Sequence, residues 1–164
     1  MEDKDVMMAS EPVAAYSPTV FDTVISYLHS SHMPLDTKRA VYRQLQAEVA
    51  DENLAYLKRR LKEISSLKDG WDGYGEAISI NPKTIRVMGQ FLKCCNSADL
   101  EEWRLSPNIN GTLLLELDDA AISISSNSLS FYAEKGDNLL TEEGIESTPE
   151  NISSTVRRIN SFMQ

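Results

Sequence analysis

The sequence is poor in the residues that define disulfide-bonded and metal-binding proteins. Only two of its 164 residues are cysteines and two are histidines. Cys94 and Cys95 are adjacent, and neighbouring helical residues point about 100° apart, so we do not expect them to form a disulfide. We expect reduced thiols, at least one of them buried, in a cytoplasmic protein. So few soft ligands predict neither a metal centre nor a cofactor.

Long apolar runs and positive charge are also missing. No run of roughly eighteen apolar residues occurs, which predicts no membrane span, and the acidic first residues lack the apolar segment of a signal peptide. The net charge of −9 argues against nucleic acid and anionic membranes as partners. Most of this charge follows residue 96, where the sum is −8. Ordinary solvent-exposed faces would account for this negative charge. The more specific alternative is an acidic sheet that binds a basic partner.

Motifs for nucleophilic catalysis are absent as well. The chain has no Gly-x-Ser-x-Gly sequence, and His29 and His32 lie near its start, where we expect both to be exposed. Residues 38–68 are locally basic, but they lack the interleaved aromatic residues of a nucleic-acid-binding patch. We therefore predict no catalytic residue.

Apolar residues recur at helical spacing in several segments. The polar residues 1–16 show no period and predict a mobile N-terminal tail, with a single domain over 17–164. The segment over about 36–64 fits one long helix or two consecutive ones. The other predicted helices begin at Ser17-Pro18, at Asn81-Pro82 and at Thr148-Pro149.

Alternating apolar residues predict strands between residues 103 and 135. Asn110-Gly111 is the strongest turn signal among them. The acidic residues 137–147 show no clear period and predict at most a short strand over 138–141. Helices, then strands, then a helix indicate an α+β fold. We expect an antiparallel β-meander of three to five strands packed by N-terminal helices and a C-terminal helix.

A loop from Leu67 to Glu76 concentrates three of the seven glycines. Glycine tolerates positive φ, so this loop should follow a tight, irregular path. We expect Trp71 and Tyr74 to turn inward and anchor it, and Asp72 to accept hydrogen bonds from backbone N–H groups. The alternative is a binding loop in which Asp72, Tyr74 and Glu76 face a ligand. The spacings of phosphate-binding and calcium-binding loops are not met.

Two short motifs resemble those of a group of small bacterial proteins. In that group, Trp-Asp-Gly/Ser-Tyr-Gly precedes a helix, and a strand of the form Gly-x-hydrophobic-x-hydrophobic-Glu follows. The resemblance covers about residues 60–135 of this chain, and it implies no activity. Leu117 stands where the group usually has tryptophan. The matching positions are Trp71, Asp72, Tyr74, Gly75, Gly111 and Glu116.

Two hypotheses of function follow. The first is a non-catalytic protein-binding module, antitoxin-like, immunity-like or chaperone-like by analogy of size and charge. Its partner would be another protein, and self-association through a sheet edge or the first helix is a further alternative. The second is a carboxylate- or divalent-metal-dependent enzyme in which Asp72, Glu76 and Glu116 converge, with Asp118 and Asp119 nearby. The predicted binding residues are Trp71, Asp72, Tyr74, Glu76 and Glu116.

Overall fold

The computed structural model describes residues 26, 28, 29 and 31–164. The predicted tail over 1–16 lies outside these residues, as does most of the helix predicted from Ser17, and the single domain over 17–164 stays a prediction. The chain divides into two compact units, Met1–Leu45 and Gln46–Gln164. The elements are α2 (Leu35–Ser65), α3 (Pro82–Cys94), the 3₁₀ helix η1 (Ser97–Leu100), β1 (Arg104–Pro107), β2 (Leu113–Leu117), β3 (Ala120–Ile124), β4 (Ser128–Lys135), β5 (Asn138–Glu146) and α4 (Pro149–Met163).

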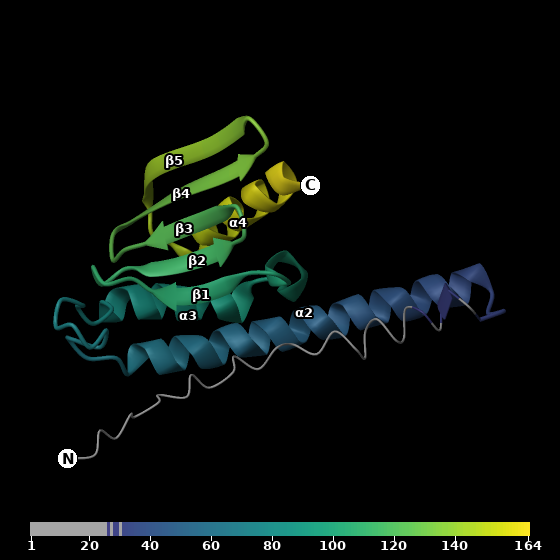
Figure 1. The fold of residues 1–164 in the computed structure, drawn as a ribbon, viewed down its shortest axis with the longest axis horizontal. Helices are drawn as coiled ribbons and strands as arrows, with labels where there is room; N and C mark the ends of the chain where they lie inside the picture. The colour runs from purple at the N-terminus through teal and green to yellow at the C-terminus, as the bar shows by residue number, and fades with distance from the viewer. Residues whose placement is uncertain (1–25, 27, 30) are drawn as a thin grey trace, which may run out of the picture. The chain divides into compact units, whose positions relative to one another are not determined.

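The fold is α+β, as the sequence predicts. Five antiparallel strands lie side by side in chain order, so that β1 and β5 are the two edges of the sheet. Helices α3 and α4 cover one face of this sheet (Figure 1). The segment for which one helix or two were expected is a single uninterrupted helix, α2.

The strands follow the predicted alternation of side chains. On β2, Leu113 and Leu115 are fully buried, whereas Leu114 between them is half-buried on the opposite face. Leu115 lies opposite Ile122 in the register, so both contribute to the layer beneath α3 and α4. The other face of the sheet carries small and polar residues such as Ser123, and no helix of unit Gln46–Gln164 covers it in Figure 1.

The core lies between this sheet and the helices. The predicted starts of the two later helices are confirmed: Asn81 accepts a hydrogen bond from the backbone N–H of Lys83, and Thr148 accepts one from that of Asn151. Pro82 and Pro149 occupy the first helical turns, where no N–H is needed. Buried apolar residues of the helices are Leu57, Leu61, Ile64, Val87, Met88, Phe91, Leu92, Ile152, Val156 and Ile159.

Two expectations were wrong. β5 spans nine residues instead of a short segment, because its ladder with β4 continues past a register shift near Leu129 and Phe131. Both cysteines are free, but neither is buried: Cys94 is exposed and Cys95 is half-buried, because α3 ends there and the chain turns toward η1. The partial burial of Cys95, as the largest effect, raises the pKa of its thiol.

Two further expectations concern the histidines and membrane-crossing helices. His29 and His32 are exposed, as predicted. Within residues 26, 28, 29 and 31–164, none of the helices has the combination of length and apolar character that a membrane crossing requires.

Candidate functional site: the glycine-aromatic loop

The loop between α2 and α3 is built onto the turn between β1 and β2. The backbone N–H of Ile78 donates to the carbonyl of Ile109 at 2.9 Å. Gly111 in that turn has φ +82°, and a Cβ there would lie 3.2 Å from the carbonyl oxygen of Ser79. Glycine is therefore needed at position 111 both for its backbone conformation and for the close approach of the loop.

Hydrogen bonds within the loop fix its shape. The N–H of Gly70 donates to the carbonyl of Ala77 at 2.6 Å and so closes the loop. The Asp72 carboxylate accepts from the N–H groups of Tyr74 and Gly75, each at 3.2 Å. This is the backbone-capping role that the sequence predicts for Asp72.

Asp69 ties the beginning of the loop to its end. Its carboxylate accepts a hydrogen bond from the backbone N–H of Ser79 at 2.8 Å. This hydrogen bond favours the charged form, so the pKa of Asp69 lies below its ordinary value, and a side-chain hydrogen bond from Ser79 adds to the effect. The ionised carboxylate is therefore the form that holds the loop together.

The two aromatic residues of the loop behave differently. Trp71 is half-buried, and its indole Nε1–H donates to the carbonyl of Ile78 at 3.1 Å, as the anchoring prediction requires. The same prediction is wrong for Tyr74, whose side chain is 91% exposed. Backbone bonds already close this short loop across Gly70 and Ala77, which leaves no interior to receive a second ring.

Exposed apolar side chains gather at this end of the sheet. Ile78 is 51% exposed and Ile109 is 52% exposed, and their backbones are hydrogen-bonded to each other. Together with Trp71 and Tyr74 we call them the loop-end patch. Sequence reasoning missed both isoleucines, although an isoleucine inside the polar turn before Asn110-Gly111 is a usable signal.

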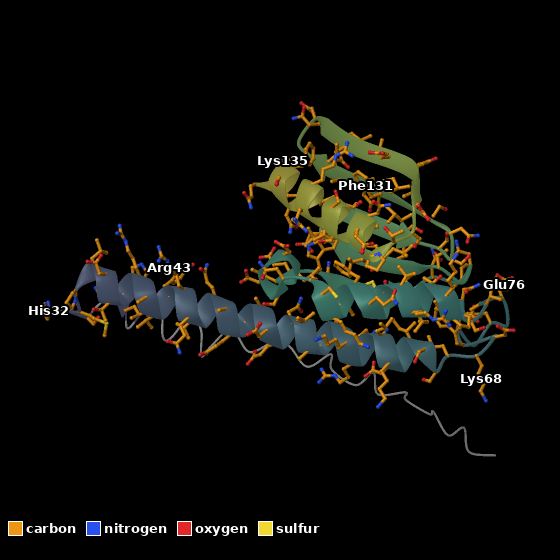
Figure 2. All side chains as sticks on the ribbon, turned by 180° about the vertical axis from the view of Figure 1, so that it is seen from behind. His32, Arg43, Lys68, Glu76, Phe131 and Lys135 are labelled. Carbon is orange, nitrogen blue, oxygen red and sulfur yellow. The ribbon has the colours of Figure 1, made fainter. Side chains whose placement is uncertain are left out.

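The predicted carboxylates do not come together. Glu76 is exposed on the loop (Figure 2), whereas Glu116 lies on β2, where it accepts a hydrogen bond from the Ser106 hydroxyl. At about 3.3 Å per residue, Glu116 is roughly 16 Å along the strand from Gly111, where the loop approaches the sheet. Asp118 is paired with Arg104 at 2.9 Å. Among the described residues, no three His, Cys, Asp or Glu side chains could hold a metal ion.

A separate cavity of about 520 Å³ lies beside η1 and α4. Its polar groups are engaged with one another: Asn160 accepts from the indole of Trp103 at 3.0 Å and donates to the carbonyl of Asp99 at 2.7 Å. Arg157 lies 3.8 Å from the Asp99 carboxylate. Because its residues come from distant segments, no sequence motif marks this cavity.

Comparisons of the chain with protein-family models, with curated proteins and with solved structures find no match. The resemblance to the bacterial group stays a prediction.

Proposed function

We propose that this protein is a non-catalytic, cytoplasmic protein-binding module whose binding surface is the loop-end patch together with Asp72 and Glu76. One observation carries the proposal: a large aromatic ring, that of Tyr74, is 91% exposed on a loop whose backbone is fixed by its own hydrogen bonds. Ordering such a residue on binding costs little entropy, and aromatic anchors commonly dominate interfaces. The two free cysteines fit a reducing compartment.

The surroundings of the patch indicate the character of the partner. Three acids, Asp69, Asp72 and Glu76, accompany one base, Lys68, on the loop. A matching partner would offer an apolar pocket for the Tyr74 ring with basic groups around it. Glu116 is outside this surface, because it lies on the uncovered face of the sheet at β2.

The experiment uses the tagged full chain to capture partners from its native host. We expect one protein in stoichiometric amount, and we expect Tyr74→Ala to weaken its binding roughly thirtyfold, as truncation of a central anchor does. Tyr56→Ala is the matched control, because Tyr56 is a tyrosine that is 38% exposed on α2. Binding measured by calorimetry should be unchanged in this control. Equal affinity of both variants for the captured protein would show that the partner binds elsewhere.

A further inference from the structure

Within the described part of the chain, the outer edge of β5 is an unpaired strand edge. β5 pairs with β4 on one side only, and it forms the border of the sheet in Figure 1. Its residues are largely exposed, and Leu139 is an exposed apolar residue, at 65%. A long exposed edge of this kind is a template for an additional strand.

The hairpin register shows which backbone groups face outward. Lys135 pairs with Asn138 across a two-residue turn, so hydrogen-bonded and non-hydrogen-bonded pairs alternate from there along the ladder. Leu139, opposite Glu134, falls in a non-hydrogen-bonded pair, and the N–H of Glu134 indeed donates away from β5, to Asp119. The N–H and C=O groups of Leu139 and Thr141 therefore point out of the sheet. Among the residues that the structure describes, none donates to or accepts from them across this edge.

The opposite edge of the sheet is protected. There, two side chains of α2 donate to the backbone of β1 and of the residue before it. Asn53 donates to the carbonyl of Trp103 at 3.1 Å, and Arg60 donates to that of Leu105 at 3.4 Å. Among the described residues, β5 has no such cover over Asn138–Glu142, and Asn151 of α4 donates to the carbonyl of Glu146 at 2.9 Å, at the far end of the strand. β5 contains neither lysine nor proline, the residues that commonly block an edge. Its irregularity lies beyond Glu142, where Gly144 has φ +72°. A regular edge therefore remains at Asn138–Glu142.

Charge and apolar surface identify what would occupy this edge. Residues 134–146 contain five acids and one base, Lys135. On the face away from α4, Leu139 lies diagonally across the register from Tyr132, which is 49% exposed and lies opposite Thr141. We propose that Asn138–Glu142 is a docking edge for an extended, basic segment of another protein, which joins the sheet as a sixth strand with apolar side chains against Tyr132 and Leu139.

This surface is independent of the loop-end patch. Figure 2 shows Lys135, at the end of β4, and Glu76, on the glycine-aromatic loop, at opposite ends of the unit Gln46–Gln164. A second copy of the chain is the less suitable occupant, because pairing β5 with itself brings two acidic edges together.

The test uses the full chain and a synthetic probe of alternating lysine and valine with blocked ends, labelled for fluorescence anisotropy. We expect Leu139→Pro to weaken binding about tenfold, because it removes an N–H that faces the probe and no hydrogen bond of the β4–β5 ladder. Leu139→Ala keeps this N–H and should weaken binding only about two- to threefold. A probe in which alternate backbone amides are N-methylated should bind at least about tenfold more weakly than the parent probe. Circular dichroism checks that each variant is folded.

Three outcomes would overturn this proposal. The first is equal binding of the N-methylated and unmodified probes, which would mean attraction by charge alone. The second is a folded Leu139→Pro variant that binds the probe as tightly as the unaltered chain. The third is a dimer in sedimentation that Leu139→Pro dissociates, since the occupant would then be a second copy. None of these results bears on the loop-end patch, whose test depends on Tyr74.

Discussion

At the scale of single residues, the glycines decide how closely the loop approaches the sheet. Gly111 and Gly75 share the same φ of +82°, but a Cβ at Gly111 would lie 3.2 Å from the Ser79 carbonyl, whereas one at Gly75 would have no atom within 4 Å. We expect Gly75→Ala to lower the free energy of unfolding by about 1–2 kcal/mol through backbone strain alone. Gly111→Ala should cost more, because it adds this contact. Urea unfolding of both variants measures the difference, and equal losses would mean that the Ser79 contact is unimportant.

The pH dependence of the loop rests on another single residue, Asp69. Its pKa is lowered in the folded protein, so its hydrogen bond to Ser79 contributes stability above the ordinary carboxyl pKa. That contribution is lost as pH falls through the lowered pKa. We therefore expect Asp69→Asn to be less stable than the unaltered chain at neutral pH, with a difference that shrinks below about pH 4. Urea unfolding across this range measures it, with Glu76→Gln as the control for removal of one loop charge. A difference that does not vary with pH would contradict this role of Asp69.

Single residues of the loop also show which side-chain positions the sequence predicts and which it does not. The sequence correctly predicts that Asp72 caps backbone N–H groups and that the Trp71 indole finds a partner. It wrongly places the Tyr74 ring inside the loop. Two aromatic residues on a glycine-rich loop have no periodicity that separates an inner from an outer face, so only the closed backbone path shows which ring has room to pack.

At the scale of elements, α2 holds the β1 edge through Asn53. The amide nitrogen of this half-buried residue donates to the carbonyls of Leu100 and Trp103. Asn53→Ala leaves both carbonyls without this donor and should lower the free energy of unfolding by about 1–3 kcal/mol. Asn138→Ala is the matched control: its amide makes a local, exposed contact with Lys135, and we expect a change within about 0.5 kcal/mol. Thermal unfolding of both variants measures this difference. Equal effects would show that the Asn53 hydrogen bonds do not stabilise the β1 edge.

The helices and strands differ in how clearly their sequences predict them. Starts of α3 and α4 could be predicted because Asn81-Pro82 and Thr148-Pro149 act locally, through a capping side chain and a fixed φ. The full length of β5 could not, because its acidic residues and Gly144 break the alternation that reveals a strand. Its pairing partner, β4, supplies the hydrogen bonds that keep it extended, and a long-range partner leaves no local signal.

At the scale of the whole molecule, the unit Gln46–Gln164 presents the two surfaces for which we propose partners. The loop-end patch offers exposed apolar side chains on a fixed backbone, and the β5 edge offers backbone groups in an acidic setting. The candidate carboxylate site of the sequence does not assemble, since Glu116 lies on β2, roughly 16 Å along the strand from Gly111, where the loop approaches the sheet. The exposed surfaces of this unit are therefore the features on which we base the proposal of protein binding.

Photo-crosslinking in the native host tests the central claim most directly. A photoreactive phenylalanine derivative replaces Tyr74 in one variant and Tyr56 in the other, and cross-linked products are identified by mass spectrometry. We expect position 74 to yield one dominant protein adduct and position 56 to yield none of it, because Tyr74 is 91% exposed on the fixed loop and Tyr56 lies away from it on α2. The absence of any adduct at position 74, or the same adducts at both positions, would contradict the proposed binding surface.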